Sequence, residues 1–351
     1  MYEQGVIRPP SEASSLLIRV TRNCPWNQCL FCPAYKGVRF SKRTVEEVKQ
    51  DIDSMADELS GYSGVRTAFL QDADSLVLPV DDLVAILDHL KEKFPKINRV
   101  TTYARARTLS HKSVNDLKRI KQAGLTRIHS GMESGSERVL QMIKKGMTPE
   151  EVVTGGTHVM EAEIELSEYI MPGVAGQALS EEHAIKTAEL LNLIHPHFIR
   201  VRTFAMHPQS PMQKMVMEGT FVPLTDDEIV VEIRLLVNHL DSMHSYFSCN
   251  DFSLNLLMQV DGFLDEKKEY MLKELDAYLS MTKRQKQVYT LLHYAWYSRY
   301  PLSVVNDQRV LDQVVPEIER LEKSGGKHGF DEYIRMFKTY QLPQPQTDNW
   351  C

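Results

Sequence analysis

Short apolar, β-branched runs alternate along the chain with longer stretches in which apolar residues recur every three or four positions, from Leu16 to about Leu240. Runs of the first kind predict buried strands, and the longer spacing predicts amphipathic helices. Six strand–helix units are expected, with strands at 16–21, 65–70, 99–103, 126–130, 164–170 and 198–204. Strands that alternate regularly with helices are typical of a parallel sheet. The pattern therefore predicts an α/β fold.

The starts of several helices carry a chemical marker. Thr44 is followed by Glu47, and the stretch after it has apolar residues at steps of three and four. Thr or Ser followed by Glu three residues later is typical of a capping box, in which the two side chains satisfy backbone N–H groups of the first turn. The same spacing occurs in the pairs Ser134/Glu137 and Thr225/Glu228. Helices are therefore expected to begin at all three places.

The alternation stops after Leu240, and long helical patterns follow at 266–279 and 282–300. A polar, proline-containing tail covers 342–351. We therefore expect an N-terminal extension (1–15), a partial (βα)6 TIM-like barrel (16–240) and a mainly helical C-terminal region (241–351). No flexible linker separates the last two parts, so the helical region is expected to pack on the barrel.

The composition suits an ordinary globular protein, since 42% of the 351 residues are hydrophobic and 25% are charged. The net charge of -6 and the pI near 6.1 argue against a surface that neutralises nucleic-acid phosphates. The start of the chain lacks the basic and apolar regions of a signal peptide, and no stretch approaches the ~18–20 apolar residues that span a bilayer. We therefore expect a cytoplasmic protein without a membrane partner.

Three of the five cysteines, Cys24, Cys29 and Cys32, lie together directly after the first predicted strand. Structural zinc sites use four ligands, usually in two pairs, whereas a cubane iron–sulfur cluster tolerates three protein ligands and leaves one iron open. No second ligand pair follows, so the three thiolates favour such a cluster. Two alternatives stay open here: a zinc site completed by a distant histidine, and a closed four-ligand site if Cys249 lies close.

A strand followed by three closely spaced cysteines, with the aromatic Phe31 directly before the last, resembles the radical S-adenosylmethionine (SAM) superfamily. Four residues separate Cys24 from Cys29, where three are more common in that superfamily. The resemblance implies that Cys24, Cys29 and Cys32 hold a 4Fe-4S cluster whose open iron SAM chelates, and that Phe31 lies beside these cofactors. It also implies reductive cleavage of SAM to a 5'-deoxyadenosyl radical, with an electron from a flavodoxin- or ferredoxin-type donor, and hydrogen abstraction from a substrate.

Acidic residues follow two further strands, at the ends where a βα barrel places its reactive groups. The segment from Gln71 to Asp74 lies where the superfamily usually has Gly-Gly-Glu, which implies that Asp72 or Asp74 accepts hydrogen bonds from the SAM ammonium. An N-cap or a solvated turn would explain Asp74 equally well. The segment around Glu133 resembles Gly-x-Glu-Ser-Gly of the branch that contains oxygen-independent coproporphyrinogen dehydrogenases. This resemblance implies that Glu133 contacts SAM, and a purely structural loop is the alternative.

Polar residues on the fifth and sixth predicted strands complete the candidates. Ser167 and Tyr169 share one face of a strand that ends in a glycine turn, similar to the segment with which superfamily members shape the adenine and ribose pocket. Arg200 and Arg202 also share a face, and a guanidinium can bind a carboxylate of SAM or of a substrate through two hydrogen bonds. Arg105 is a further candidate of this kind. The alternative for Ser167 and Tyr169 is a hydrogen bond within the core. The alternative for Arg200 and Arg202 is an outward position in solvent.

The resemblance leaves the substrate open, because members of a superfamily share cofactor chemistry rather than substrates. A small molecule is expected, and a tetrapyrrole would be a guess. A radical SAM enzyme that modifies RNA is one alternative, which the acidic balance and the lack of a recognisable RNA-binding module argue against. A non-enzymatic iron–sulfur or zinc protein that uses the same cysteines is the alternative from another class.

Overall fold

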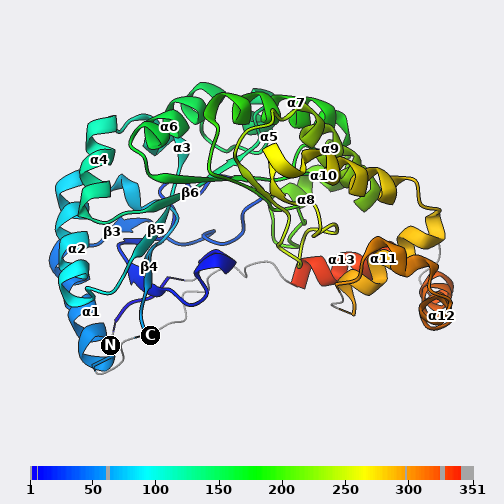
Figure 1. Ribbon diagram of the computed structural model, residues 1–351, viewed down its shortest axis with the longest axis horizontal. Helices are drawn as coiled ribbons and strands as arrows, with labels where there is room; N and C mark the ends of the chain where they lie inside the picture. The colour runs from blue at the N-terminus through cyan, green and yellow to red at the C-terminus, as the bar shows by residue number, and fades with distance from the viewer. Residues whose placement is uncertain (1, 6, 61–63, 297–298, 325–328, 341–351) are drawn as a thin grey trace.

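A sheet of eight strands forms the frame of the protein in the computed structural model, which describes residues 2–5, 7–60, 64–296, 299–324 and 329–340 (Figure 1). Its strands, in spatial order, are β1 Leu16–Arg19, β4 Thr67–Gln71, β5 Arg99–Ala104, β6 Arg127–Glu133, β7 Glu165–Ile170, β8 Phe198–Val201, β9 Tyr246–Ser248 and β10 Asp261–Phe263. The six predicted strands are confirmed, each within a few residues of its expected bounds. The predicted polar tail, 342–351, lies outside the described residues.

Neighbouring strands from β1 to β9 run parallel, and β10 runs antiparallel to β9. Parallel neighbours need a crossover connection, which here is helical. The helices up to β9 are α1 Val45–Glu58, α2 Val80–Lys93, α3 Ala106–Ser110, α4 Val114–Ala123, α5 Glu137–Met142, α6 Pro149–Glu161, α7 Gly176–Ile194, α8 Met212–Met217 and α9 Asp226–His239. Figure 1 shows the sheet curved into an arc with α1, α2, α4, α6 and α7 around its outer side. The fold is therefore an α/β partial TIM-like barrel.

The two faces of the sheet differ in character, as the alternation of side chains along each strand allows. Outer-face residues join the apolar core formed with the helices, among them Ile18, Leu70 and Ile128. A chain of rings crosses the inner face from β4 to β7, with successive centroids 5.3, 5.8 and 5.9 Å apart, formed by Phe69, Tyr103, His129 and Tyr169. An inner face with polar and aromatic groups suits ligand binding.

Residues before β1 lie against this inner face. The side-chain amide of Gln71 accepts a hydrogen bond from the backbone N of Gly5 (2.9 Å) and donates one to the carbonyl of the same residue (3.2 Å). Glu12 is fully buried and accepts a hydrogen bond from Ser15 Oγ at 2.6 Å. Its other carboxylate oxygen lies 3.7 Å from Nε2 of His129. The N-terminal extension therefore covers part of the barrel interior.

Two of the three predicted capping boxes are confirmed, and one is wrong. Thr44 and Thr225 form the expected boxes at the starts of α1 and α9. The box predicted at Ser134 does not form, because Ser136 caps α5. Ser134 Oγ instead accepts a hydrogen bond from the backbone N of Ser136 (3.1 Å) and lies 2.8 Å from Nδ1 of the buried His183.

The sheet continues beyond Leu240, which the sequence pattern did not predict. Strand β9 pairs in parallel with β8, so that Phe247 lies opposite Ile199, and β10 adds an antiparallel edge. Each of the two strands has three residues, too few to show a period-two pattern. The sheet therefore extends to Phe263, and the division of the chain into domains stays a prediction.

The C-terminal region is mainly helical and packs against α9 (Figure 1). Its helices are α10 Leu264–Leu279, α11 Lys283–Tyr294, η3 Leu302–Asn306, α12 Gln308–Ser324 and α13 Gly329–Tyr340. The helix predicted at 282–300 thus ends earlier, at Tyr294. Tyr278 Oη donates to Asp227 Oδ1 at 2.9 Å and links α10 to α9. No helix among the residues described is long and apolar enough to cross a membrane.

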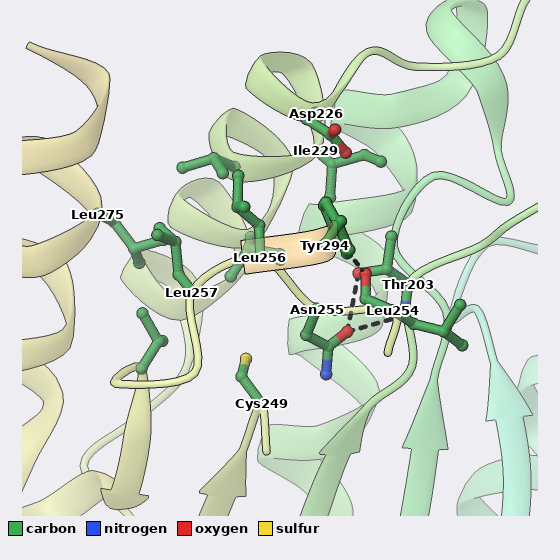
Figure 2. A pocket seen from close by; sticks show the side chains of 13 residues that line it. Thr203, Asp226, Ile229, Cys249, Leu254, Asn255, Leu256, Leu257, Leu275 and Tyr294 are labelled. Carbon is green, nitrogen blue, oxygen red and sulfur yellow. Dashed lines mark hydrogen bonds between the residues drawn. The ribbon is translucent and has the colours of Figure 1, made fainter. Parts of the chain in front are cut away.

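A small cavity lies at the joint between the barrel and the C-terminal region (Figure 2). Its volume is about 10 Å³, and its lining is mostly apolar. Asn255 bridges the joint, because its Oδ1 accepts a hydrogen bond from Thr203 Oγ1 (2.9 Å) and its Nδ2 donates to the Val201 carbonyl (2.7 Å). Cys249 lines the same cavity. A space of this size holds at most about one water molecule, so the joint is part of the packed core.

Candidate active site

The three cysteines lie on an irregular loop, residues 23–40, at the carboxyl end of β1. Asn23 and Asn27 adopt positive φ angles of 68° and 47°, which asparagine tolerates better than most residues. Their side chains also bind across the loop, since Asn23 Nδ2 donates to the Arg39 carbonyl at 2.6 Å and Asn27 Nδ2 donates to the Tyr35 carbonyl. Asparagines within the loop therefore help to set its shape.

A second loop, residues 143–147 between α5 and α6, holds the cysteine loop in place. Trp26 Nε1 donates to the Lys144 carbonyl at 2.7 Å. The backbone N of Leu30 donates to the Ile143 carbonyl at 2.9 Å. Two hydrogen bonds thus join the segment that carries Cys29 to a loop more than one hundred residues later in the chain.

Arg105, at the carboxyl end of β5, supports the second loop. Its Nη2 donates to the carbonyls of Lys145 (3.1 Å) and Gly146 (2.9 Å). The guanidinium also lies 5.2 Å from the ring centroid of Trp26. In the structure its guanidinium binds backbone carbonyls, and its expected contact with a carboxylate of SAM or of a substrate stays a prediction.

An ion pair lies beside the cysteine loop. Glu133, the last residue of β6, has a φ of 60°, and its Oε1 lies 2.8 Å from Nζ of Lys145. Gly131 leaves room for this carboxylate, because a Cβ there would lie 2.6 Å from Oε1. Nζ of Lys145 also lies 5.6 Å from the ring centroid of Phe31. Burial alone would lower the pKa of Lys145, but the charges of Glu133 and Cys29 outweigh it and raise that pKa.

Asp72 is fully buried and has protein partners on both carboxylate oxygens. Arg19 Nη2 lies 2.7 Å from Oδ2, and the backbone N of Asn23 donates to the same oxygen at 3.0 Å. Oδ1 accepts a hydrogen bond from Tyr35 Oη at 3.5 Å, and a Cβ on Gly5 would lie 2.1 Å from it. Burial raises the pKa of Asp72, although Arg19 acts against this rise. Asp72 thus ties the cysteine loop to the barrel at two points, Asn23 and Tyr35.

Asp74 is also fully buried, but it faces α3. Thr108 Oγ1 donates to its carboxylate at 2.5 Å. Burial raises the pKa of Asp74 to about 6, against the hydrogen bond from Thr108 and the charge of Arg105. Its side chain forms no capping hydrogen bond with the following 3-10 helix η2 Ser75–Val77. Of the two predicted carboxylates, Asp72 is therefore the one in contact with the cysteine loop.

The chemistry of the three thiols fits a cluster with three protein ligands. All three are free and partly exposed. Burial raises the pKa of Cys29 and raises that of Cys32 to about 11, and in both cases the charge of Cys24 adds to the rise. The three sulfurs therefore lie within range of one another's charge. Metal ions relieve such repulsion, since a coordinating thiol is deprotonated and its charge is shared with the metal.

A structural zinc site would need a closed set of four ligands. In the part of the chain that the structure describes, no three His, Cys, Asp or Glu side chains are placed to hold a single metal ion. A cubane cluster does not need such a placement, because each thiolate binds a different iron. Cys249, which could have closed a four-sulfur set, is buried and lines the cavity at the joint with the C-terminal region (Figure 2).

Arg200 and Arg202 lie on the face of the sheet that carries Ser167 and Tyr169, rather than pointing outward. Arg200 Nε donates to Ser167 Oγ at 2.9 Å. Arg202 Nη1 lies 3.6 Å from Oδ2 of Asp251, in the loop after β9. Burial raises the pKa of Tyr169, and the charges of both arginines act against this rise. These side chains therefore face a common space on the inner side of the sheet.

A buried polar network, which no sequence motif predicted, lies behind the loops after β6 and β7. Glu232 of α9 accepts hydrogen bonds from the backbone N of Gly173 (2.7 Å) and from Ser180 Oγ. Its Oε1 lies 3.6 Å from Nε2 of His183, whose Nδ1 lies 2.8 Å from Ser134 Oγ. Burial raises the pKa of Glu232 to about 7 and lowers that of His183 to about 4. Helices α7 and α9 thus fix two loops at the carboxyl end of the sheet.

Sequence reasoning also missed Trp26, Lys145 and Gly146. Trp26 lies within the cysteine motif, but the sequence does not indicate that its indole N–H donates to the carbonyl of Lys144. Lys145 follows Glu133 by twelve residues, after a short helix, where a lysine and a glycine are ordinary signals of a helix end. The positive φ of Gly146 (68°) is the physical feature that such a glycine can mark.

Comparison with known proteins identifies the sequence family. Residues 18–189 match the radical SAM superfamily. Over 141 residues, the chain is 28% identical to an uncharacterized methyltransferase of Pyrococcus horikoshii. That match covers 39% of this chain and 28% of the other protein. The chain therefore corresponds to less than two thirds of the length of this relative.

Solved structures share the fold at low identity. The cobalamin-dependent S-adenosylmethionine radical enzyme OxsB, with aqua-cobalamin and S-adenosylmethionine bound, has a TM-score of 0.52 and 14% identity, over 93% of this chain and 59% of that one. The same enzyme with aqua-cobalamin bound has a TM-score of 0.52 and 15% identity, over 92% of this chain and 58% of that one.

These similarities do not single out a branch, so the resemblance to coproporphyrinogen dehydrogenases stays a prediction, as do the roles of individual site residues. Residues 18–189 of this chain are a domain of the radical SAM superfamily, whose members bind a 4Fe-4S cluster and SAM.

Proposed function

We propose that this protein is an enzyme that holds a 4Fe-4S cluster through Cys24, Cys29 and Cys32 and cleaves SAM reductively. The observation that carries the proposal is the set of three free thiols on a shaped loop at the carboxyl end of β1, beside the buried Glu133–Lys145 pair. Barrel enzymes gather their reactive groups at this end of the strands. When bound, the cluster and SAM supply one-electron chemistry, which produces a 5'-deoxyadenosyl radical that takes a hydrogen atom from a substrate.

Glu133 and Phe31 are the residues that we propose beside SAM. Oε1 of Glu133 pairs with Lys145, and a carboxylate accepts hydrogen bonds on both oxygens. Oε2 can therefore accept from a ribose hydroxyl or from the SAM ammonium. Phe31 directly precedes Cys32, and its ring centroid lies 5.6 Å from Nζ of Lys145, where an apolar ring helps to exclude water from the reacting atoms.

Asp72 and Asp74 receive supporting roles in this proposal. Asp72 holds the cysteine loop through Arg19 and Asn23, so a direct contact with the SAM ammonium would require it to exchange the arginine for the ligand. Asp74 is engaged with Thr108 on the α3 side. We therefore assign the carboxylate that contacts SAM to Glu133 rather than to either aspartate.

We propose that the substrate is a small polar molecule that binds on the inner face of the sheet. Ser167 and Arg200 are hydrogen-bonded to each other there, and Nη1 of Arg202 lies 3.6 Å from the carboxylate of Asp251. A guanidinium at that separation can turn to a carboxylate of SAM or of the substrate and form two hydrogen bonds. The net charge of -6 disfavours RNA as the substrate. A flavodoxin- or ferredoxin-type protein is the proposed electron donor.

Methyl transfer is a second candidate outcome of the same SAM chemistry. The observation that favours it is the similarity to the Pyrococcus horikoshii protein described as a methyltransferase. The two outcomes leave different products, because methyl transfer converts SAM to S-adenosylhomocysteine, whereas radical cleavage releases methionine and 5'-deoxyadenosine.

The proposal is tested by anaerobic reconstitution with iron and sulfide, followed by incubation with SAM and dithionite. Chromatography then measures 5'-deoxyadenosine and S-adenosylhomocysteine in the wild type and in Cys29→Ala. We expect deoxyadenosine from the wild type and none from the variant. Neither product from a wild-type protein that carries a cluster would contradict the proposed function, and S-adenosylhomocysteine alone would favour the second candidate.

A further inference from the structure

We propose that the ammonium of Lys145 makes the cluster easier to reduce, and that Glu133 limits this effect by pairing with it. The inference rests on the proposed function, since it takes Cys29 and its two neighbours as the cluster ligands. It assigns a role to Lys145, which no sequence motif marks.

The position of Lys145 is fixed from two sides. Its side chain is 11% exposed, and Nζ lies 2.8 Å from Oε1 of Glu133 and 5.6 Å from the ring centroid of Phe31. Its backbone carbonyl accepts a hydrogen bond from Arg105 at 3.1 Å. The ammonium therefore cannot move into solvent without breaking a buried ion pair and leaving the carboxylate of Glu133 without its partner.

The loop that carries Lys145 also lies against the cysteine loop. The backbone N of Leu30, the residue after Cys29, donates to the Ile143 carbonyl at 2.9 Å, and Trp26 Nε1 donates to the Lys144 carbonyl at 2.7 Å. Phe31, whose ring centroid lies 5.6 Å from Nζ of Lys145, is the residue before Cys32. A cluster held by this loop would therefore lie near the charges of Lys145 and Glu133, and at this depth they are only weakly screened by solvent.

The sign of the effect follows from the charge balance of the reduction step. One electron passes from the reduced donor to the cluster, so the donor is oxidised and the cluster gains one negative charge. No bond forms or breaks in this step, and no proton is transferred. A buried cation next to the cluster stabilises the reduced form and raises the reduction potential, because net charge is one of the factors that set that potential. A carboxylate paired with the cation offsets part of the rise.

Four variants distinguish the effect of the Lys145 and Glu133 charges on the cluster from the effect of their packing. Lys145→Gln removes the cation, and Lys145→Arg keeps it. Glu133→Gln removes the opposing charge and leaves an amide oxygen that can accept from Lys145. The control is Lys144→Gln, because the side chain of Lys144 is exposed and only its backbone carbonyl takes part in the site.

The measurement is an anaerobic redox titration of the reconstituted full chain, followed by the electron paramagnetic resonance (EPR) signal of the reduced cluster, without SAM. We expect Lys145→Gln to lower the ratio of reduced to oxidised cluster about tenfold at a fixed potential, which is ~59 mV for a one-electron couple. Glu133→Gln should shift the midpoint upward, while Lys145→Arg and Lys144→Gln stay near the wild type.

The inference is overturned if Lys145→Gln and Glu133→Gln both titrate with the wild-type midpoint, since the two residues would then only pack the site. If Lys145→Gln does not hold a cluster, Glu133→Gln decides: an upward shift supports the inference, and an unchanged or lower midpoint overturns it. Failure here is distinct from failure of the proposed function, because deoxyadenosine formation by the wild type does not depend on the direction of these shifts.

Discussion

A Cβ atom on Gly146 would lie 2.2 Å from Cε2 of the Trp26 indole. The same glycine has a φ of +68°, a backbone conformation that favours glycine. It is therefore required both for its backbone conformation and for the close approach of the ring. Because Trp26 lies two residues after Cys24, this contact positions the cysteine loop against the loop of residues 143–147.

Gly146→Ala is expected to loosen the cysteine loop. The added methyl group must displace the indole, and the left-handed backbone is strained for alanine as well, so the combined loss of unfolding free energy is about 2–5 kcal/mol. Urea unfolding of the apo-protein measures this loss, and the iron content after reconstitution should fall in parallel.

Gly219→Ala is the matched control for that prediction. Gly219 has a φ of +69°, but a Cβ at this position would meet nothing within 4 Å beyond its chain neighbours, so only the backbone cost of about 1–2 kcal/mol applies. Its iron content should equal that of the wild type. Equal losses of stability and iron in the two variants would show that the contact with Trp26 does not matter.

Asp72→Asn should impair cluster assembly. The substitution removes the buried carboxylate that pairs with Arg19, which keeps Glu3 as its other acidic partner, and weakens the acceptor for the backbone N of Asn23, a loss of about 1.5–3 kcal/mol. We expect a large decrease in iron bound per chain after reconstitution, measured together with the unfolding free energy of the apo-protein.

Asp74→Asn serves as the control for Asp72→Asn, since both carboxyls are fully buried. An amide at position 74 can still accept the hydrogen bond from Thr108, so the iron content should stay at the wild-type level. A different result would speak for the role predicted from the sequence: normal iron content in Asp72→Asn, combined with weaker SAM binding, would mean that Asp72 contacts the ligand directly.

Stability should decrease with rising pH because of Glu232. Burial raises the pKa of this carboxyl to about 7, above its ordinary value of 4.5, against the hydrogen bonds from Ser180 and Gly173. The folded chain therefore holds this proton more tightly than the unfolded chain. The contribution is fully present below pH 4.5 and is lost as the pH rises through about 7.

Glu232→Gln removes this dependence. Relative to the wild type, the variant should gain on the order of 2–3 kcal/mol of unfolding free energy between about pH 5 and pH 8. Urea unfolding of the two apo-proteins at both pH values gives the difference, in which the contribution of the neighbouring His183 largely cancels. A difference that does not change with pH would contradict the assignment.

The parallel sheet could be predicted because its strands bury an apolar outer face and alternate with helices marked by capping residues. The three cysteines were singled out from the sequence because they lie within a run of nine residues, and their role as cluster ligands stays a prediction. Strands β9 and β10 could not be predicted, because each has only three residues, too few to show an alternating pattern of apolar and polar residues. At the start of α5, Ser134 and Ser136 both precede Glu137, and which serine caps the helix depends on backbone angles that the sequence does not reveal.

The remaining site contacts join residues that are far apart in the chain. The hydrogen-bond acceptors for Trp26 and Arg105 are backbone carbonyls. Because every residue type has a backbone carbonyl, no sequence motif indicates which residues supply these acceptors. From the sequence, Arg105 was expected to bind a carboxylate because a guanidinium favours that partner, and nothing in the sequence indicated the carbonyls that it contacts. Asp72 was recognised by its position after β4, but its partner Arg19 looked like an ordinary strand residue. The sequence thus identified the cysteines and charged residues of the candidate site, and the structure shows which contacts these residues form.

An iron that is free to bind SAM is best tested on the reconstituted protein, by iron and sulfide analysis together with EPR spectra of the dithionite-reduced sample before and after SAM is added. We predict one 4Fe-4S cluster per chain and a spectrum that changes when SAM binds, with no cluster in a variant in which Cys24, Cys29 and Cys32 are all replaced by Ala. A cluster whose spectrum is unchanged by SAM, or a protein that takes up zinc in its place, would contradict the proposed chemistry.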